Sequence, residues 1–316
     1  MNMFMNKMKI LVVGGAGFIG SHVVDLLVEK GHEAYVLDNL SSGKKENIND
    51  KAKFFEIDLG EYDKLKEIFS RERFDIVYHL AAQIDIRKSV DDPVFDAKIN
   101  ILDSLNLIEC CVRNNVKHFV FSSSGGAIYG DDAEIPTSED AEERPVSAYG
   151  CAKLALEKYL HFYNKVYGLK YSCLRYSNVY GPRQNSKGEA GVIAIFFDNM
   201  LNRRKPIIFG GTQTRDFVYV GDIARANVLV LDDMGSEIYN VGTGKEIDII
   251  ELFSKMNGFF GNKFEAEFRE RKKGEQLKSC LSFEKIGRNF GWMPEIELDE
   301  GLKRTYEWFF GKFKKS

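Results

Sequence analysis

A tyrosine and a lysine four residues apart could act together as an acid–base pair. They are Tyr149 and Lys153, in the stretch SAYGCAKLALEKYL. A spacing of four places both side chains on one face of a helix. An ammonium group beside a phenol stabilises the phenolate and lowers the phenol pKa toward the range of a general base. Such pairs also occur on many solvent-exposed helices, so the surrounding elements must decide what this pair does.

A glycine-rich turn near the N-terminus could bind a phosphate group. The stretch is VVGGAGFIGSH. It fits the pattern G-x-G-x-x-G with Gly15, Gly17 and Gly20, and the pattern G-x-x-G-x-x-G with Gly14, Gly17 and Gly20. Glycine permits a tight turn and close approach to a pyrophosphate, and the next helix offers free N–H groups at its positive end. Asp38, 18 residues after Gly20, could accept hydrogen bonds from both ribose hydroxyls, which favours NAD over NADP.

The elements that must position these residues alternate along the first half of the chain. Apolar runs predict strands at 9–13, 33–38, 53–58, 75–81, 118–123 and 170–176, with helical patterns between them and a long helix over about 148–167. Strands that alternate with helices indicate parallel pairing in a doubly wound α/β sheet. Asp58 ends the third strand and either bonds the adenine amino group or caps the strand end. After Asn178 the pattern becomes irregular, without repeats or a Pro/Ser-rich linker.

Length, charge and cysteine usage exclude several classes of protein. A chain of 316 residues with 44% hydrophobic and 29% charged residues fits two domains, or one domain with a substantial appendage. The net charge of -3 gives no electrostatic case for nucleic acid or an anionic membrane as partner. No stretch resembles a signal peptide or a membrane span. The five cysteines lack metal or redox spacing, so we expect no metal site and a cytoplasmic protein.

Motifs spread over nearly the whole chain point to a family. They are GGAGFIGSH, DNLSSG, HLAAQ, SSSGGAIYG, YGCAK, RYSNVYGPRQ, RDFVYVGDIARA, YNVGTG and FGWMPEIELDEGL. With them the chain resembles the extended short-chain dehydrogenase/reductases, and more narrowly the UDP-galactose 4-epimerase family of nucleotide-sugar enzymes. The resemblance implies a Rossmann-type NAD-binding domain over 1–180 plus about 214–242. A smaller mixed α/β domain over about 181–213 and 243–316 would bind the nucleotide sugar.

The resemblance also implies the roles of individual residues. Tyr149 would be the catalytic base, Lys153 its electrostatic partner and a ligand of the nicotinamide ribose, and Ser124 the partner of the sugar 4-hydroxyl. The residues implied to bind NAD are Gly14, Gly17, Phe18, Ile19, Gly20, Asp38, Asn39, Ser42, Gly43, Asp58, Leu59, Leu80, Ala81, Ala82, Asn100, Ser122, Tyr149, Lys153 and Tyr176. Those implied to bind the substrate are Ser124, Tyr149, Asn178, Gly191, Val192, Arg215, Arg271, Lys272 and Ser279.

The implied reaction is a reversible oxidation of the sugar at C4. Tyr149 takes the proton of the 4-hydroxyl while C4 gives a hydride to NAD, and the hydride returns to the opposite face after the keto sugar rotates. Related 4,6-dehydratases place an Asp-Glu pair directly after the catalytic Ser or Thr, where this chain has Gly125 and Gly126. Two glycine hydrogens cannot shuttle a proton, which disfavours a dehydratase. Asp38 argues against an NADP-dependent reductase.

The substrate prediction depends on the stretch KKGEQLKSCLS. In the family, the residue five positions after the glycine of an Arg-x-Gly-Asp/Glu motif borders the sugar 2-position, and here that residue is Ser279. A small side chain leaves room for an N-acetyl group, so UDP-N-acetylglucosamine and UDP-N-acetylgalactosamine are favoured, with UDP-glucose and UDP-galactose also accepted. Alternatively, Ser279 only lies on a strand or loop. Arg215 would bind the diphosphate through its rigid fork of donors, or form a surface ion pair.

Two departures from the family pattern leave alternatives open. The arginine of the motif is replaced by Lys272, so either this residue or Arg271 could supply the second diphosphate cation. Asp85 stands where the family has a small polar residue; it either repels a uronate or points to solvent. The other functions considered are a UDP-glucuronate 4-epimerase or decarboxylase and a non-catalytic dinucleotide sensor. The family further suggests a homodimer formed by helices at roughly 95–115 and 148–167.

Overall fold

The chain folds into two compact units. The computed structural model describes residues 7–84, 86–186, 191–271 and 276–314, with the backbone alone at 86 and 87. The first unit comprises Met1–Ser123, Ser147–Leu174 and Ala224–Ile238. The second comprises Ser124–Val146, Arg175–Ile223 and Tyr239–Ser316.

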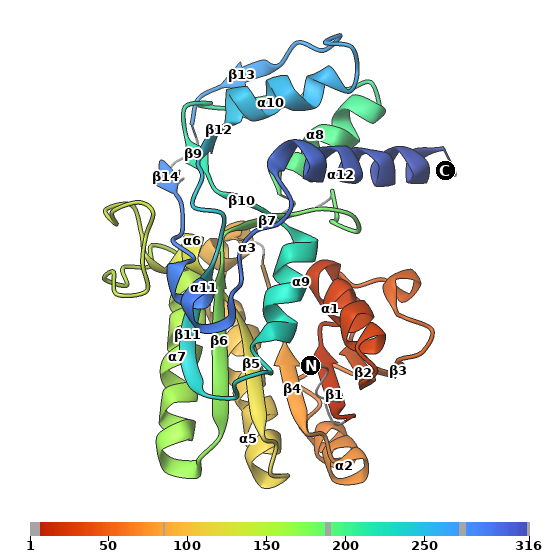
Figure 1. The fold of residues 1–316 in the computed structure, drawn as a ribbon, viewed down its shortest axis with the longest axis vertical. Helices are drawn as coiled ribbons and strands as arrows, with labels where there is room; N and C mark the ends of the chain where they lie inside the picture. Colours follow the sequence, from red (N-terminus) through yellow and green to blue (C-terminus); the bar gives the residue numbers. More distant parts are fainter. Residues whose placement is uncertain (1–6, 85, 187–190, 272–275, 315–316) are drawn as a thin grey trace. The chain divides into compact units, whose positions relative to one another are not determined.

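A seven-stranded sheet forms the framework of the first unit (Figure 1). The strand order is β11-β6-β5-β4-β1-β2-β3, and the pairs β3–β2, β2–β1, β1–β4 and β4–β5 are parallel. Three of these strands, β5, β6 and β11, continue into residues of the second unit. The strands are β1 (Lys9–Val13), β2 (Glu33–Asp38), β3 (Lys53–Glu56), β4 (Ile76–His79), β5 (His118–Ser124), β6 (Lys170–Tyr176) and β11 (Ser236–Val241).

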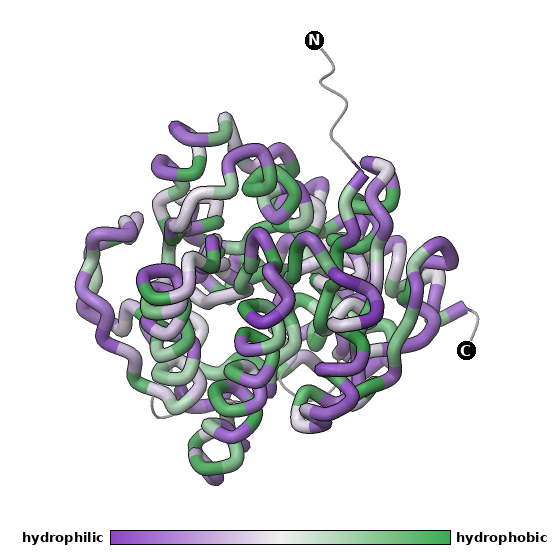
Figure 2. The backbone as a smooth tube through the Cα atoms, turned by 90° about the horizontal axis from the view of Figure 1, so that it is seen from below, coloured by the Kyte–Doolittle hydropathy of each residue, from purple (hydrophilic) through white to green (hydrophobic). Residues whose placement is uncertain are grey.

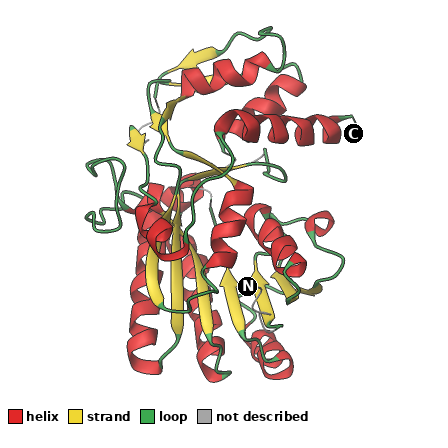
Figure 3. Ribbon diagram, in the orientation of Figure 1, coloured by secondary structure: helices red, strands yellow, loops and turns green. Residues whose placement is uncertain are grey.

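Helices lie against the sheet, as the red and yellow elements of Figure 3 show. These are α1 (Phe18–Glu29), the 3-10 helix η1 (Lys45–Asn47), α2 (Tyr62–Glu72), α3 (Ile86–Asp91), α4 (Pro93–Ala97), the π-helix η2 (Lys98–Asp103), α5 (Ser104–Arg113), α7 (Ala148–Tyr167) and α9 (Val220–Leu229). Alternate strand residues face opposite sides of the sheet. Leu11, Val13, Tyr35 and Leu37 share one core cluster with apolar residues of α2, α5 and α7. The Tyr78 hydroxyl donates to the Asn227 carbonyl of α9 over 2.8 Å.

The helices of this unit are amphipathic, which explains how they cover the sheet. In α2, the buried residues Leu65, Ile68 and Phe69 follow the three-to-four spacing of one helix face. Figure 2 shows the result as an alternation of hydrophobic and hydrophilic segments along the coiled stretches of the tube. The prediction of a Rossmann-type doubly wound sheet is confirmed.

Short strands and helices make up the second unit. They are α6 (Gly125–Ile128), β7 (Asn178–Tyr180), α8 (Val192–Leu201), β8 (Ile207–Phe209), β9 (Thr214–Arg215), β10 (Phe217–Tyr219), β12 (Ile247–Asp248), α10 (Ile249–Gly258), β13 (Glu267–Arg269), β14 (Lys278–Ser279), α11 (Glu284–Phe290) and α12 (Leu298–Phe313). Its small sheets are β10-β7, β12-β9-β14 and β13-β8. An aromatic group including Phe197, Phe259 and Tyr306 joins α8, the end of α10 and α12.

Most predicted elements are present, with differences at their ends. The strands at 9–13, 33–38 and 170–176 and the helix at 148–167 have the predicted bounds, whereas β3 and β4 are shorter than predicted. The helix predicted over 95–115 is present as a run of three consecutive helical elements, α4, the π-helical turn η2 and α5, which together span 93–113. The two compact units also divide the chain differently from the predicted domains, notably at 124–146. The domain boundaries that we inferred for function stay a prediction.

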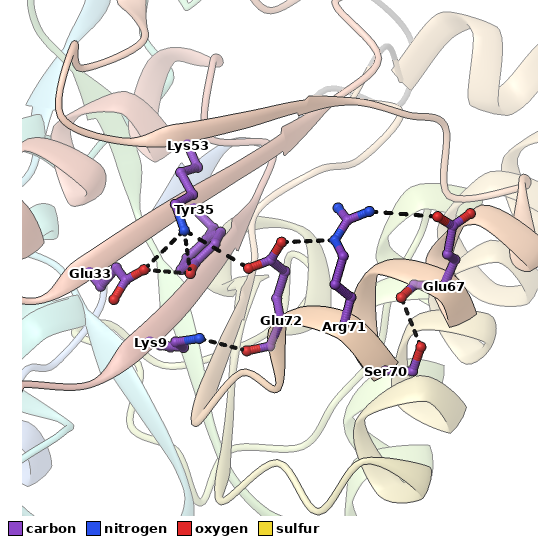
Figure 4. A network of polar contacts seen from close by, with 8 residues as sticks. All are labelled: Lys9, Glu33, Tyr35, Lys53, Glu67, Ser70, Arg71 and Glu72. Atoms are coloured by element: carbon purple, nitrogen blue, oxygen red, sulfur yellow. Dashed lines mark hydrogen bonds and ion pairs between the residues drawn. The ribbon is translucent and has the colours of Figure 1, made fainter.

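A polar network links the amino ends of the first strands to α2 (Figure 4). The Tyr35 hydroxyl donates to Glu33 Oε1 over 2.5 Å and accepts from Lys53 Nζ over 3.1 Å. Lys53 also approaches Glu72 on α2, to 4.0 Å. Tyr35 is fully buried, so these contacts satisfy a hydroxyl that would otherwise be unpaired in the core.

Among the described residues, no helix is long and apolar enough to cross a membrane.

Candidate active site

Glycines shape the turn between β1 and α1 into a surface that a phosphate can approach. Gly14 has a φ of +83°, and a side chain there would meet the backbone nitrogen of Ala81 at 2.6 Å. A side chain on Gly20 would overlap the carbonyl oxygen of Gly14, so α1 lies directly on the turn. Gly17, the N-cap of α1, has no side chain to bond the first N–H groups. This open helix end fits a pyrophosphate.

Asp38 ends β2 beside the same turn. Its carboxylate accepts hydrogen bonds from the backbone N–H of Ala16 over 3.1 Å and of Leu40 over 2.9 Å. Burial raises the pKa of Asp38, and the two N–H donors oppose that rise. A side chain on residue 43 would meet the Asp38 carboxylate at 2.7 Å, so the glycine at this position keeps a side chain away from that carboxylate. An acceptor in this position fits the ribose hydroxyls of NAD.

Asp58 has structural partners of its own. Its Oδ2 accepts from Asn39 Nδ2 over 2.6 Å, and its Oδ1 accepts from the N–H of Gly60 over 2.8 Å. Its backbone N–H donates to Glu61 at the start of α2. Asp58 therefore stabilises the loop between β3 and α2. Its contact with adenine stays a prediction, as does the binding of NAD by Asn39.

Helix α7 places Tyr149 and Lys153 on one face, as the sequence predicts. Lys153 is 3% exposed, and its Nζ donates to the carbonyl of Ser122 over 2.7 Å. The same Nζ lies 4.7 Å from the ring centre of Phe121 and 5.6 Å from that of Tyr149. The ammonium group is thus anchored to the end of β5 and lies beside the phenol ring.

Burial governs the protonation of both groups. It lowers the pKa of Lys153 to about 8, although the carboxylates of Glu157 and Asp96 favour the charged form. It raises the pKa of Tyr149 above its usual range, and the negative charge of Asp96 adds to that rise. The lowered tyrosine pKa that the sequence predicts is therefore wrong for the chain alone, in which burial and the charge of Asp96 both raise it.

The three serines at the end of β5 face different surroundings. Ser123 is buried and donates to Glu157 Oε1 over 2.5 Å, whereas Ser122 and Ser124 are half-buried. Glu157 is 1% exposed and continues the four-residue spacing of Tyr149 and Lys153 along α7. Glu157 and the buried Asp96 were not predicted from the sequence, although the spacing of four could have shown Glu157.

In the second unit, the glycines after Ser124 pack against the segment around Ser279. A side chain on Gly125 would meet Leu281 Cδ1 at 2.5 Å, and one on Gly126 would meet Ser279 Oγ at 3.5 Å. Ser279 is 5% exposed and lies on β14 directly opposite Arg215 of β9. Close packing therefore explains the glycine at 125, whereas position 126 has room for a Cβ atom.

The other predicted substrate residues of this unit occupy separate positions. Asn178, on β7, donates through Nδ2 to the Asp216 carbonyl over 3.3 Å. Arg215 donates through Nη1 and Nη2 to the Thr214 and Gln276 carbonyls, over 2.8 Å each. Gly191 is the N-cap of α8 and Val192 its first residue, so both adjoin the positive end of a helix. Arg271 is exposed beside Gly210.

Some predicted residues take no part in the contacts above. Tyr176 is buried at the end of β6, and Phe18 and Ile19 open α1. Ser42 lies in the loop after β2, and Leu59 in the loop after β3. Asp85 and Lys272 lie outside the described residues, so their roles rest on sequence alone.

Comparison with known families identifies the cofactor that this surface holds. Residues 10–242 match the NAD dependent epimerase/dehydratase family. The chain belongs to this family. The uncapped start of α1, the close-packed glycine turn and the carboxylate of Asp38 fit NAD, as the sequence predicts. The predictions of an epimerase-family enzyme and of NAD as its cofactor are confirmed.

Two relatives are similar to this chain over almost their whole length. A Methanocaldococcus jannaschii protein, provisionally named a UDP-glucose 4-epimerase, is 48% identical over 95% of this chain and 97% of its own. A UDP-glucose 4-epimerase of Mycolicibacterium smegmatis is 41% identical over 96% of this chain and 99% of its own.

Solved structures agree with this assignment. The UDP-glucose 4-epimerase of Thermotoga maritima, solved with UDP-glucose, has a TM-score of 0.95 at 47% identity and covers 96% of this chain and 99% of its own. The Thermus thermophilus enzyme, in complex with NAD, has a TM-score of 0.91 at 41% identity, with the same coverage. A UDP-N-acetylglucosamine 4-epimerase of Methanobrevibacter ruminantium, in complex with UDP-N-acetylmuramic acid, has a TM-score of 0.92 at 35% identity and covers 98% of this chain and 100% of its own.

Proposed function

We propose that the protein interconverts the two 4-epimers of a UDP-hexose, with NAD as its cofactor. The observation that carries the proposal is the half-buried Tyr149 beside the buried Lys153 at the end of β5, in a member of an NAD-dependent family. The names of the relatives support a UDP-sugar as substrate and C4 as the reacting carbon.

In this proposal Tyr149 accepts the proton of the sugar 4-hydroxyl and later returns it. NAD, when bound, takes the hydride from C4 and gives it back, so the cofactor is regenerated in every cycle. Lys153 contributes a positive charge beside the phenol, held in place by its bond to the Ser122 carbonyl. Ser124 bonds the sugar hydroxyl, and Arg215 and Asn178 contact the diphosphate. Gly125 and Gly126, which follow Ser124, carry no side chain that could supply the acid–base pair that elimination of water would need.

We further propose that the enzyme accepts N-acetylated hexoses and favours them over glucose and galactose. The support is the small side chain of Ser279, whose hydroxyl lies near Gly126, a residue that has no side chain. Relatives named for glucose and one named for N-acetylglucosamine both have this fold, so the fold by itself does not decide which substituent at C2 is accepted.

Parallel incubation with UDP-N-acetylglucosamine and UDP-glucose, followed by proton NMR of the products, tests both proposals. We expect both sugars to be epimerised, the N-acetylated one with the higher kcat/KM. Activity on UDP-glucose alone would remove the argument from Ser279 and leave the epimerase reaction in place. Release of carbon dioxide from UDP-glucuronate, with no epimer from either hexose, would overturn the proposed function.

We also infer that the protein is a homodimer. Helix α7 exposes an apolar stripe at helical spacing, with Tyr159 at 41%, Phe162 at 45%, Val166 at 57% and Tyr167 at 55% of full exposure. On the neighbouring π-helical turn η2, the apolar side chain of Leu102 is 58% exposed. Apolar stripes of this kind are typical of interfaces between subunits, and the two helices are those for which the sequence predicts dimer contacts.

A further inference from the structure

The buried carboxylate of Asp96 has no role in the mechanism above. The side chain lies on α4 and is 1% exposed. Its Oδ1 accepts from Asn100 Nδ2 over 3.0 Å and from Gln83 Nε2 over 3.5 Å, while its Oδ2 is buried and has no hydrogen-bond partner among the residues that the structure describes. A buried carboxylate oxygen without a hydrogen-bond partner lowers the stability of the folded protein, because it has lost its bonds to water. Such a group is expected where it contributes to function.

Asn100 uses its amide group inside the chain. Its Oδ1 accepts from the N–H of Gln83 over 2.8 Å, and its Nδ2 donates to the Gln83 carbonyl over 2.9 Å as well as to Asp96. An amide has two N–H donors, and both are engaged here. Asn100 is therefore arranged to hold the backbone of Gln83 rather than to donate a hydrogen bond to a ligand.

The local helix geometry brings the three residues together. Asp96 lies on α4 and Asn100 on the π-helical turn η2 that follows it. π-helical turns are frequent at functional sites. Asn100 is 3% exposed, so the π-helical turn directs its amide into the unit, toward the loop that follows β4.

Gln83 ends the segment that supports the glycine turn. The N–H groups of Leu80 and Ala81 both donate to the Val13 carbonyl, over 2.8 and 3.0 Å. The backbone of Ala81 is also the surface against which Gly14 packs. A displacement at Gln83 would therefore be passed to the turn that fits the pyrophosphate.

We propose that Asp96 is a positioning residue for the cofactor: it orients the Asn100 amide, which clamps the segment Leu80–Gln83 against the glycine turn. The proposal depends on NAD as the cofactor and is independent of which sugar is the substrate. It assigns Asn100 an indirect part in NAD binding, through the backbone of Gln83.

The variants Asp96→Ala, Asp96→Asn, Asn100→Ala and the double alanine variant test this proposal. The dissociation constant of NAD is measured by calorimetry on protein stripped of nucleotide, and folding is checked by circular dichroism. We expect about tenfold weaker NAD binding for Asp96→Ala and for Asn100→Ala, because each leaves a buried polar group unpaired.

The dissociation constant of NAD for Asp96→Asn should stay within about threefold of wild type, since an amide oxygen can accept the same hydrogen bonds. The double variant should be no weaker than Asn100→Ala.

Asp92→Ala is the matched control. Asp92 caps α4 by accepting from the N–H of Phe95 over 2.9 Å and does not touch Asn100. Its loss should lower the melting temperature and leave NAD affinity unchanged, which separates helix stability from positioning.

Three results would overturn the proposal: unchanged NAD affinity in Asp96→Ala, effects of the two alanine variants that add in full, or Asp96→Asn as weak as Asp96→Ala. If Asp96→Ala does not fold, Asn100→Ala still tests the proposal, because unchanged NAD affinity in that variant would contradict a clamp formed by the Asn100 amide. Failure of the wild-type protein to bind NAD would contradict the assigned cofactor instead.

Discussion

The Nζ of Lys153 lies 2.7 Å from the carbonyl oxygen of Ser122. One helical turn further along α7, Glu157 accepts a hydrogen bond from Ser123. Two consecutive residues at the end of β5 thus bind two residues of α7 that are four apart. This double contact fixes the register of the helix on the sheet, and with it the position of Tyr149.

Replacing Tyr149 by phenylalanine should abolish turnover while the fold is retained. The variant removes the only group proposed to take the 4-hydroxyl proton, so we expect kcat to fall by about 100-fold or more. NMR of the sugar products measures this, and calorimetry should show NAD affinity within a small factor of wild type. Wild-type turnover in this variant would disprove the proposed mechanism.

Asp96→Asn should shift the pH dependence of epimerisation to lower pH. The Asp96 carboxylate raises the pKa of both Tyr149 and Lys153, so removing its charge lowers both. Tyr149 then loses its proton at lower pH, and the rising limb of the rate against pH moves in that direction. Profiles of kcat/KM across neutral and alkaline pH measure this shift. A profile that keeps its position would show that the Asp96 charge does not influence the catalytic pair.

Gly125→Ala should destabilise the second unit. The new methyl group would meet Leu281 Cδ1 at 2.5 Å, and overpacking of this kind lowers stability by about 1–3 kcal/mol. Gly126→Ala is the control, because its methyl group would make an ordinary contact of 3.5 Å with Ser279 Oγ. Denaturant unfolding measures the difference between the two. Equal stability of both variants would mean that the segment around Leu281 can move aside.

Tyr35→Phe should destabilise the protein without affecting NAD binding. It removes the hydroxyl that joins Glu33 and Lys53 (Figure 4), a loss of about 1 kcal/mol at neutral pH. The hydrogen bonds from Tyr35 and Lys53 lower the pKa of Glu33. This contribution is therefore present at neutral pH and is lost as the pH falls through the Glu33 pKa of the folded protein.

Unfolding free energies at neutral and acid pH test the Tyr35 prediction. Lys45→Gln serves as control, since the ion pair between Lys45 and Glu56 is more than half exposed on both sides and should contribute little. A Tyr35→Phe effect that does not shrink at acid pH would exclude the link to Glu33.

Phe162→Glu should convert the proposed dimer into a monomer. A carboxylate in the exposed stripe of α7 would have to be buried without a partner if two subunits met there. Size-exclusion chromatography with light scattering measures the mass of wild type and variant. A monomeric wild type would rule out the dimer.

Much of this protein can be predicted from its sequence, because the signals concerned are local. The glycine turn and Asp38 depend on one strand–helix–strand unit, β1–α1–β2, and Tyr149 and Lys153 on one helix, so spacing alone was sufficient for them. The strands β1, β2 and β6 and the helix α7 also follow from local patterns of apolar residues. The π-helical turn η2 was not predicted, because the apolar pattern indicates a helix without showing whether its N–H groups bond the carbonyl four or five residues back.

Only the tertiary structure decides what lies around these residues. The sequence relates Gly125 and Gly126 to missing acid–base chemistry, but their packing partners Leu281 and Ser279 are more than 150 residues away in the chain. Asp96 likewise becomes significant only when the fold buries it against Asn100 and Gln83. The pKa of Tyr149 was predicted in the wrong direction for the same reason: spacing shows the nearby lysine charge, whereas burial, which has the larger effect, depends on the whole unit.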